Sequence, residues 1–419
     1  MEKDICIINL SGKNNYAIVT PNRITYGLNA SKKEFDSLLS EEKTLLLKRK
    51  NRKKTTKKLD SVISMGIIPT FDCNLKCLYC YSLGGDTKEN LLFDNISEFL
   101  KNEGSGEKLL KLNFVGGGEP FLNFELVSDL VSYAKKIFKK VEIGVVTNGT
   151  FNGKVLDWII ENKVSIRISY DSIFHDLQRP YRNGESSRNK ILQNIKIFRE
   201  IKYPVSIQTI ITKHGVNHMN SIIDELVALN IEVVKFEPSL STNVSRYDGE
   251  IDPDPVKYAR ALLGSIKYIA DRNLNLVIDT GFFAEPSNDY YCGMPTGNMV
   301  VTPHGLITSC VEVARSTDPY SEVLIYGILK NKKASLWKDR LSFLNNMHFR
   351  NQIGGCKICN LRLICHGGCP MANIWENGIP IKKSSFTCKI EHELIPGLLL
   401  MIAERKDIAK IVIEEPCIN

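Results

Sequence analysis

Short apolar runs alternate with longer amphipathic stretches from about residue 62 to residue 240. Short, largely apolar runs are typical of buried strands, and apolar residues three and four positions apart are typical of helices that cover a sheet. The pattern predicts strands at Ser64–Ile68, Lys111–Phe114, Glu142–Thr147, Val164–Ser169, Val205–Ile211 and Ile231–Phe236. It predicts helices between them at Asn90–Asn102, Phe124–Lys140, Gly153–Asn162, Ser187–Ile201 and Met219–Leu229. Six such units predict an α/β fold, a partial (β/α)6 barrel of the TIM type over residues 61–280.

A small α+β appendage is predicted ahead of the barrel, over residues 1–60. Two short strands, Tyr16–Val19 and Arg23–Tyr26, are separated by a turn sequence and should pair as a hairpin. Ser31 and Glu34 have the spacing of a capping box and should open a helix.

Beyond the barrel, residues 281–395 show only short strand and helix patterns, and Gly, Pro and Cys are frequent. This is typical of a small domain that metal ligation organises more than a large apolar core does. A C-terminal helix and a tail are predicted for residues 396–419.

The composition directs attention to the cysteines. The chain has 419 residues and twelve cysteines, with neither a secretory signal pattern nor an apolar stretch long enough to span a membrane. We therefore expect a cytoplasmic protein, in which a cysteine pattern indicates metal binding or catalysis. The net charge of +8 comes partly from the run Lys48 to Lys58. A solvated linker or helix face is favoured over a dock for an acidic peptide or nucleic acid. The absence of aromatic residues from the run weakens the version with single-stranded nucleic acid.

Three cysteines follow the first predicted strand: Cys73, Cys77 and Cys80. Thiolates this close in one loop can converge on one metal centre. A zinc site or three unrelated buried thiols are the alternatives, but zinc usually takes four ligands, often from paired C-x2-C sequences. Three cysteines without an obvious fourth ligand suit a cubane iron–sulfur cluster in which one iron stays open to an outside ligand.

This spacing, placed after the first strand and with an aromatic residue, Tyr79, just before the third cysteine, resembles the radical S-adenosylmethionine (SAM) superfamily. The resemblance implies a [4Fe-4S] cluster whose open iron is chelated by the amino and carboxylate groups of SAM. It also implies an enzyme that cleaves SAM reductively to a radical.

A glycine-rich sequence, Val115 to Pro120, leaves the second predicted strand. Glycines allow a backbone to approach a ligand closely, and a carboxylate accepts hydrogen bonds from an ammonium group. A tight strand-to-helix turn would explain the glycines equally well. In the radical SAM family this element binds the methionine amino group, which implies that role for Gly117, Gly118 and Glu119.

Further SAM contacts are implied by the same resemblance. The segment from Ser169 to Arg179 looks like a family element whose serine and arginine contact the ribose and carboxylate region of SAM. Leu240, after the sixth strand, stands where a residue that packs on the cofactor is expected, although a core leucine would look the same. Asn148 ends the third strand and could reach the site, but a turn explains it more simply.

Seven more cysteines lie from Cys292 to Cys388, which is more than one zinc site needs. The C-x3-C-P ending resembles that of bacterial ferredoxins, whose fourth cysteine binds the other of two clusters. This logic assigns one closed cluster to Cys356, Cys359, Cys365 and Cys388. It assigns a second cluster to Cys292, Cys310 and Cys369. Two zinc ribbons are the alternative.

The order of these cysteines resembles the SPASM extension of radical SAM enzymes that modify peptides. The resemblance implies two auxiliary clusters, hence three [4Fe-4S] clusters in all. The Cys292 set has three cysteines only, so either another ligand such as Asp289 completes it or one iron is open to a substrate thiolate. We interpret Cys6 as a core thiol and Cys417 as a tail thiol.

Peptide maturation is the function that the resemblance favours. The radical would take a hydrogen atom from a ribosomally made peptide, and an auxiliary cluster would accept the electron left behind, which gives a thioether or a carbon–carbon crosslink. We expect as partners a precursor peptide, whose leader would add a strand to residues 1–60, and an electron donor such as flavodoxin or ferredoxin. We expect neither a nucleic acid nor a membrane partner.

Two other functions stay open. Anaerobic sulfatase-maturating enzymes, which form formylglycine, resemble this chain, but they carry an aspartate directly after the cysteine that matches Cys310. Here Val311 and then Glu312 follow, so Glu312 is a weak catalytic candidate. A non-catalytic electron-transfer or zinc-scaffold protein would need neither the Glu119 loop nor the segment from Ser169 to Arg179.

Overall fold

The computed structural model describes residues 5–12, 14–21, 23–50, 62–103, 108–241, 251–281, 290–330, 333–347 and 349–413. Residues 51–58 of the basic run, Asp289 and Cys417 lie outside these ranges. The predicted α/β architecture with a large parallel sheet is confirmed.

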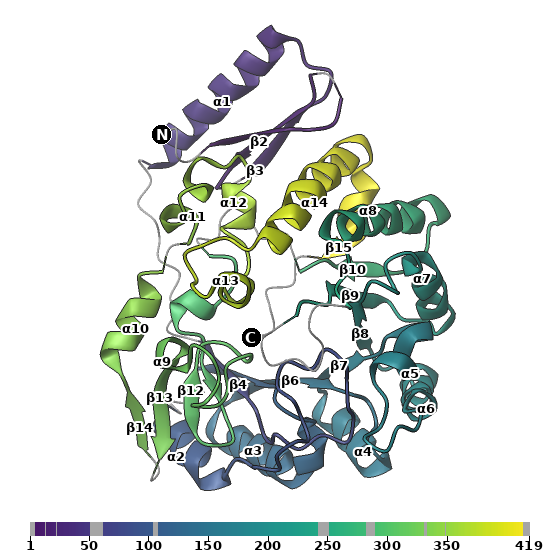
Figure 1. Ribbon diagram of the computed structural model, residues 1–419, viewed down its shortest axis with the longest axis vertical. Helices are drawn as coiled ribbons and strands as arrows, with labels where there is room; N and C mark the ends of the chain where they lie inside the picture. The colour runs from purple at the N-terminus through teal and green to yellow at the C-terminus, as the bar shows by residue number, and fades with distance from the viewer. Residues whose placement is uncertain are drawn as a thin grey trace.

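Seven strands form the parallel centre of the molecule, in the order of the chain. They are β4 (Val62–Ile67), β5 (Leu109–Phe114), β6 (Lys140–Thr147), β7 (Ser165–Ser169), β8 (Val205–Ile211), β9 (Val233–Pro238) and β10 (Val277–Asp279). The strands curve into an arc, and the helices lie on its outer side (Figure 1). The helices are α2 (Phe93–Glu103), α3 (Phe124–Ile137), α4 (Gly153–Asn162), α6 (Arg188–Glu200), α7 (Met219–Ala228) and α8 (Pro255–Arg272).

The last unit, α8 and β10, extends the six predicted units by one. The strand β10 has only three residues, which is too few to give a recognisable apolar run. The helix α8 has a clear start, because the Asp254 side chain accepts the backbone N–H of Lys257 at 2.8 Å and Pro255 occupies the first turn.

The sheet continues beyond the barrel at both edges. At one edge β11 (Val300–Val301) pairs in parallel with β4, followed by the antiparallel strands β12 (Leu306–Thr308), β13 (Ile325–Lys330) and β14 (Lys333–Leu336). At the other edge β15 (Val412–Ile413) pairs with β10. The cysteine-rich region therefore begins as an extension of the same twelve-stranded sheet.

The N-terminal appendage is a separate three-stranded sheet, β1 (Cys6–Asn9), β2 (Tyr16–Thr20) and β3 (Arg23–Gly27), followed by α1 (Lys32–Lys50). The predicted hairpin of β2 and β3 is confirmed. The capping box is confirmed as well, because Ser31 N–H donates to Glu34 Oε2 at 2.8 Å and Glu34 N–H donates to Ser31 Oγ at 3.3 Å. One face of this sheet packs on residues 361–364 and on α14 (Ser385–Glu404), and Cys6 is buried there as expected (Figure 1).

Short helices dominate the C-terminal region: α9 (Ser321–Leu324), α10 (Lys338–Asn345), α11 (Phe349–Gln352), α12 (Arg362–Cys365) and α13 (Pro370–Asn377). The long helix α14 starts well before the predicted C-terminal helix, because the Ser384 side chain caps it by accepting the N–H of Thr387 at 3.2 Å. It packs closely on α8, where a side chain at Gly397 would lie 2.5 Å from Leu263. No helix of the described residues is both long and apolar enough to cross a membrane.

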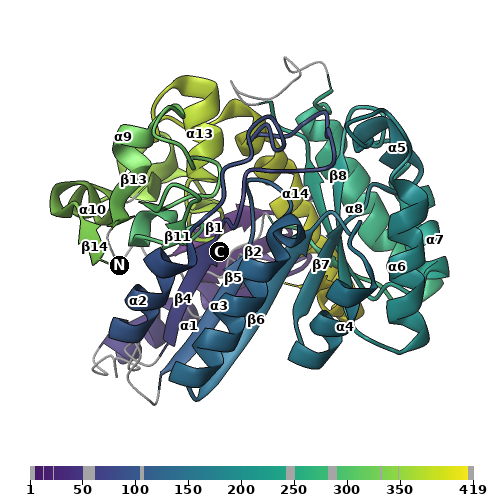
Figure 2. The ribbon, with the colours of Figure 1, turned by 90° about the horizontal axis from the view of Figure 1, so that it is seen from below.

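The helices α2, α3 and α4 cover one face of the sheet, which Figure 2 shows from below. Their apolar sides and the strands form one continuous core that extends into the C-terminal region. This core fixes the carboxyl ends of β4 to β9, where the loops with the candidate site residues begin.

Candidate active site

The Cys73–Cys80 loop leaves β4 at the carboxyl edge of the sheet. It runs along the segment that follows β7, because Lys76 N–H donates to Pro180 O at 2.9 Å and Leu78 N–H donates to Gln178 O at 3.0 Å. This backbone pairing holds the loop that carries the three thiols in one conformation.

The three thiols of this loop share one neighbourhood. Burial, with Cys77 and then Cys80 close by, raises the pKa of Cys73 well above its ordinary value. Burial also raises the pKa of Cys77 to about 11, although the nearby Arg179 opposes the shift. The backbone N–H of Gly84 donates to Cys80 Sγ at 3.4 Å. A metal centre that takes all three as thiolates would therefore release protons on binding.

The donor set and its spacing fit an iron–sulfur cluster. Within the described ranges, no three His, Cys, Asp or Glu side chains close on one point tightly enough to hold a single ion. A cube of four irons holds its thiolates at separate corners, so it needs sulfurs that stand farther apart. Soft thiolates also favour such clusters.

The glycines after β5 pack against the Cys73–Cys80 loop. Gly118 N–H donates to Thr70 O at 2.9 Å, and Glu119 N–H donates to Asp72 O at 2.8 Å. A Cβ atom at Gly118 would lie 1.9 Å from Asp72 O, and Gly117 has φ +64°. These positions need glycine because two backbones meet there. The contact of Gly117 and Gly118 with SAM stays a prediction.

Glu119 is a buried carboxyl held by three donors. Thr147 Oγ1 donates to it at 2.6 Å, Asn148 N–H at 2.7 Å and Phe121 N–H at 3.2 Å. Burial raises the pKa of Glu119 to about 7 against the opposing effect of these hydrogen bonds. A cationic ligand beside this carboxyl would favour its charged form.

The raised pKa of Glu119 gives a testable pH dependence. Because the folded-state pKa exceeds the ordinary value of 4.5, the contribution of Glu119 to stability is full below about pH 4.5 and is lost as pH rises through about 7. Without SAM, the free energy of unfolding of the wild type should fall by about 3 kcal/mol relative to that of Glu119→Gln as pH rises over this window. Denaturant unfolding of both proteins at several pH values measures it, and parallel profiles would contradict it.

Asn148 joins this carboxyl to the Cys73–Cys80 loop. Its backbone N–H binds Glu119, and its side-chain amide donates to Asn74 Oδ1 at 2.8 Å. Its Oδ1 accepts the N–H of Thr150 at 2.9 Å, which is the turn that the sequence suggested. Asn148 therefore does both: it forms the turn and it reaches the site.

A buried ion pair stands behind Cys77. Arg179 Nε lies 2.9 Å from Asp171 Oδ2, and both side chains are less than a tenth exposed. The Tyr79 hydroxyl also donates to Asp171, and the N–H of Ile210 does so at 2.9 Å. Burial raises the pKa of Asp171, but the charge of Arg179 and the hydrogen bonds outweigh it, so the pKa lies below its ordinary value.

Arg179 therefore supports the Cys73–Cys80 loop directly. Its guanidinium lies 5.1 Å from the ring centre of Tyr79 and interacts with the Cys77 thiol. The structure commits it to Asp171, whereas the predicted SAM contacts of Arg179 and Tyr79 stay untested. Ser169, at the end of β7, and Leu240, just after β9, are half-buried at the same sheet edge.

Cys310 has Cys369 and Cys292 among its neighbours. Burial, then Glu312, and then Cys369 and Cys292 raise the pKa of Cys310 well above its ordinary value, which places the three thiols near one another. Their roles as ligands stay a prediction, as does the fourth ligand.

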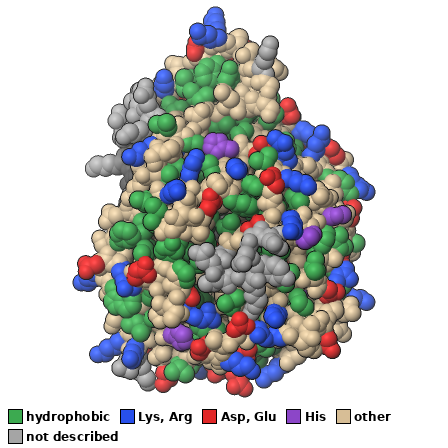
Figure 3. Space-filling model, viewed as in Figure 1, with side chains coloured by type: hydrophobic (Ala, Val, Ile, Leu, Met, Phe, Trp, Pro, Cys, Tyr) green, Lys and Arg blue, Asp and Glu red, His purple; other side chains and the backbone are tan. Residues whose placement is uncertain are grey.

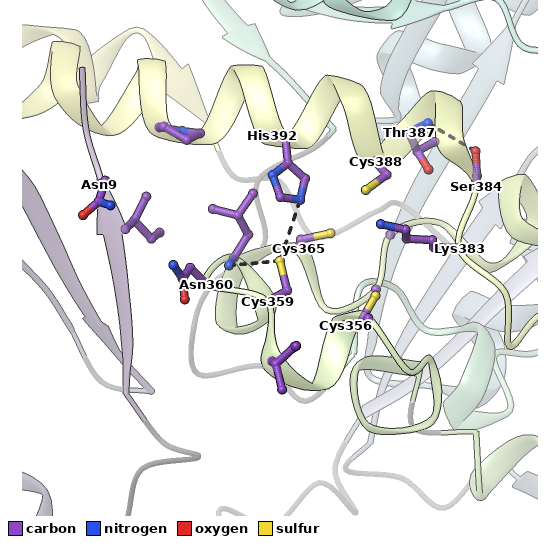
Figure 4. A pocket seen from close by; sticks show the side chains of 17 residues that line it. Asn9, Cys356, Cys359, Asn360, Cys365, Lys383, Ser384, Thr387, Cys388 and His392 are labelled. Carbon is purple, nitrogen blue, oxygen red and sulfur yellow. Dashed lines mark hydrogen bonds between the residues drawn. The ribbon is translucent and has the colours of Figure 1, made fainter. Parts of the chain in front are cut away.

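The remaining four cysteines line one pocket of about 400 Å³ between α12 and the start of α14. Figure 4 shows their sulfurs directed toward one another. We name this the four-cysteine pocket, and its cysteines are Cys356, Cys359, Cys365 and Cys388. His392, one turn after Cys388, lies with Nε2 3.7 Å from Cys359 Sγ, and Lys383 lines the opposite wall (Figure 4). Sequence reasoning missed His392, although its i,i+4 spacing from Cys388 places both on one helix face.

A sharp reversal separates the two cysteine groups. All three residues between Cys365 and Cys369 have positive φ: +52° at His366, +93° at Gly367 and +74° at Gly368. Left-handed backbone at consecutive positions turns the chain, so Cys365 faces the four-cysteine pocket and Cys369 faces Cys310. This reversal is compatible with the crossover that the C-x3-C-P spacing predicts, which stays a prediction.

Tyr81 lies between the first and second cysteine groups. Burial, then Glu312, Cys80, Cys310 and Glu237, raises its pKa well above the ordinary value, so its phenol is near all four side chains. Sequence reasoning missed Tyr81, because no spacing rule covers the residue after Cys80. A phenol and two carboxyls therefore lie near one another beside Cys80 and Cys310.

The two carboxyls near Tyr81, those of Glu237 and Glu312, are held by different partners. Glu237, a third exposed, accepts from Gln208 Nε2 at 2.5 Å and lies 2.6 Å from Lys235 Nζ. Burial raises its pKa, but Lys235 outweighs this effect and the pKa is lowered. Glu312 accepts from the indole of Trp375 at 2.6 Å, and burial raises its pKa. Lys235 and Glu237 are charged residues two positions apart in the otherwise apolar strand β9, so they lie on the same face. This pattern could have indicated Glu237 from the sequence.

Comparison with known proteins shows what the barrel is similar to. Residues 67–226 match the family model of the Radical SAM superfamily. A cysteine-type anaerobic sulfatase-maturating enzyme of Clostridium novyi is 29% identical over 195 residues, which are 42% of this chain and 51% of that protein. The chain spans 51% to 59% of the length of the curated relatives that it matches.

Two solved structures share the fold over most of the chain. Native anSMEcpe with bound AdoMet and Cp18Cys peptide has a TM-score of 0.67 and 19% identity, covering 83% of this chain and 99% of its own. Streptococcus suis SuiB bound to precursor peptide SuiA has a TM-score of 0.57 and 16% identity, covering 92% of this chain and 98% of its own. The predicted fold is confirmed, and residues 67–226 match the family that the spacing of Cys73, Cys77 and Cys80 resembles.

Proposed function

Because residues 67–226 belong to the radical SAM superfamily, we propose that this chain cleaves SAM to a 5′-deoxyadenosyl radical and oxidatively modifies a ribosomally made peptide. The observation that carries the proposal is the position of Tyr81. Tyr81 follows Cys80, and its hydroxyl lies beside Val311, which follows Cys310, because a Cβ atom at Gly116 would lie 3.1 Å from Tyr81 Oη and 3.2 Å from Val311 Cβ.

The first cysteine group would hold the cluster that reduces SAM. Cys73, Cys77 and Cys80 would supply three thiolates to this cluster. The cluster, when bound, supplies one electron to SAM. Glu119 would accept hydrogen bonds from the SAM amino group, since it is a buried carboxyl that a cation would favour in its charged form. The ion pair of Asp171 with Arg179, in which both side chains are less than a tenth exposed, holds the loop from behind.

The second group would act on the substrate after hydrogen abstraction. Cys292, Cys310 and Cys369 would hold an auxiliary cluster that takes up one electron, while a carboxyl takes up the proton that the oxidised substrate loses. Glu312 is the candidate for that proton, because it faces both Tyr81 and Glu237 beside Cys310. The four cysteines of the four-cysteine pocket would hold a closed cluster.

A peptide substrate is supported by two observations. Solved structures with this fold include one bound to a precursor peptide and one bound to the Cp18Cys peptide. The N-terminal sheet has β1 and β3 as its two edge strands, and an edge strand can pair with an extended leader. The leader site on residues 1–60 is part of this proposal.

Sulfatase maturation is the second candidate, favoured by the similarity to the sulfatase-maturating enzyme of Clostridium novyi. The missing aspartate after Cys310 argues against it, because Val311 cannot accept a proton. In that case Glu312, one position later, would have to serve as the base.

An anaerobic assay on candidate peptides separates the two. The reconstituted enzyme with SAM and dithionite should remove two hydrogen atoms from a precursor peptide encoded beside its gene, measured by mass spectrometry. A hydrazide-reactive aldehyde on a sulfatase-derived peptide would instead support the second candidate. Absence of both products, with 5′-deoxyadenosine still formed, would contradict peptide maturation.

The role of Glu312 gives a direct prediction. Glu312→Gln should lower peptide modification by roughly 10²- to 10⁴-fold, as loss of a general base does. Formation of 5′-deoxyadenosine should persist, because the proposed role of Glu312 begins only after hydrogen abstraction. Glu161→Gln, an exposed change on α4, is the matched control. Equal modification rates in Glu312→Gln and the wild type would remove Glu312 from the mechanism.

A further inference from the structure

The surface at the mouth of the four-cysteine pocket is unusual in being apolar and basic together. Ile358, which lies between Cys356 and Cys359 and lines the pocket, is 83% exposed. Ile379 and Ile381, which precede the pocket residue Lys383, are about half exposed. Ile358 and the exposed Lys383 line the same pocket, so apolar and basic side chains meet at its mouth, and exposed apolar side chains there mark an interaction site.

The charges around these isoleucines have one sign. The segments 354–362 and 378–383, which flank the pocket, contain four basic residues and no acidic residue. They are the exposed Lys357, Lys382 and Lys383, and the half-buried Arg362, which donates to Ile5 O at 2.7 Å and to Cys359 O at 3.1 Å. The acidic residue just before the second segment, Glu376, is occupied, because it accepts from Ser384 Oγ at 2.6 Å and Ser385 N–H at 2.8 Å. Where α12 meets α14, Figure 3 shows hydrophobic and Lys or Arg side chains next to one another.

We propose that this surface, formed by residues 354–362 and 378–383, is the docking site of a small acidic electron-carrier protein, and that one electron passes between its cofactor and the group held by the four-cysteine pocket. The transfer moves one electron and no atom: the carrier is oxidised and the bound group is reduced, or the reverse. The inference rests on the proposed function, since it needs a redox group at these cysteines.

Three observations favour this occupant over a peptide or a second copy of the chain. The patch opens on the pocket itself, so a docked partner stands beside the redox group. Its positive charge complements an acidic carrier and would steer it. Its few isoleucines suit the small interface of a transient redox encounter, whereas a stable dimer needs a larger apolar area. The N-terminal sheet, where we place the leader, covers another side of the pocket with Ile8 and Asn9.

Charge reversal tests the docking site. In the reconstituted enzyme, the double variant Lys357→Glu/Lys382→Glu should slow reduction by photoreduced bacterial flavodoxin on the order of tenfold at low salt, measured by stopped-flow absorbance. The wild-type rate should fall steeply with salt and the variant rate should not. Ile358→Ser should slow the reaction without changing its salt dependence. The matched control is Lys136→Glu/Lys267→Glu, two exposed lysines on α3 and α8.

Reduction by dithionite separates docking from the proposed function. Dithionite needs no protein interface, so its rate, the iron content and 5′-deoxyadenosine formation should be equal in the wild type and in the two double variants. A flavodoxin rate that the double variant leaves unchanged, or that the control lowers equally, would overturn the docking site and leave the proposed function standing. Weaker binding of the precursor peptide with an unchanged flavodoxin rate would overturn it too. Loss of 5′-deoxyadenosine formation with dithionite in the wild type would count against the proposed function instead.

Discussion

Replacing Gly118 by alanine should remove the iron held by the Cys73–Cys80 loop and abolish 5′-deoxyadenosine formation. The added Cβ would lie 1.9 Å from Asp72 O and 2.7 Å from the carbonyl carbons of Phe71 and Asp72. These are backbone atoms of the segment that leads into Cys73, so they cannot rotate away as a side chain would. We expect a loss of about 3 kcal/mol in unfolding free energy, typical of overpacking. Iron content and product formation under anaerobic conditions measure the effect.

Gly264→Ala is the matched control for this substitution. Gly264 lies inside α8, and a Cβ atom there meets no other atom within 4 Å. Alanine should stabilise this helix by about 0.5–1 kcal/mol and leave the iron content unchanged. If Gly118→Ala retained all its iron and activity, the close packing of the two loops would not matter for the site.

Replacing Asp171 by asparagine should destabilise the protein by about 3–5 kcal/mol, because it leaves the Arg179 guanidinium buried without its counter-charge. Asparagine keeps the shape and one acceptor oxygen for the N–H of Ile210, so the effect reports on charge. Because Arg179 also touches Tyr79 and Cys77, the variant should lose iron from the first cysteine group. Chemical denaturation and iron analysis measure both effects.

An exposed ion pair on the same loop provides the control. Arg182 lies 2.9 Å from Asp86, but the side chains are 37% and 44% exposed. Asp86→Asn should cost less than about 1 kcal/mol, because water screens the pair. Equal costs for the two aspartates would show that the charge of Asp171 is not what holds the Cys73–Cys80 loop.

The repeated units of the barrel could be predicted because each carries its own periodic pattern. The predicted helix Gly153–Asn162 and strand Val205–Ile211 match the structure at both ends. The edges of the sheet could not be predicted in this way. The strands β11 and β15 have two residues each, and pairing with β4 and β10 makes them strands, not any local pattern.

The cysteine groups were predictable because chain spacing limits which thiols can meet. The residues around them were not, since they depend on contacts between distant segments. Arg315, for example, donates to Ser82 O at 3.0 Å and stacks on Phe71 at 3.7 Å, joining the C-terminal region to the Cys73–Cys80 loop. Nothing local distinguishes this arginine from a surface arginine. Likewise, the family resemblance implied SAM contacts for Gly117 and Gly118. It gave no indication that both glycines pack against the backbone ahead of Cys73, which only the structure shows.

The central claim is that the Cys73–Cys80 loop holds a cluster that cleaves SAM. The most direct test is 5′-deoxyadenosine formation after anaerobic reconstitution, with SAM and dithionite, in the wild type and in the triple variant of Cys73, Cys77 and Cys80 to alanine. The wild type should form 5′-deoxyadenosine, whereas the variant should form none while keeping the iron bound by the other cysteine groups. Failure of a fully reconstituted wild type to form it, or formation by the triple variant, would contradict the claim.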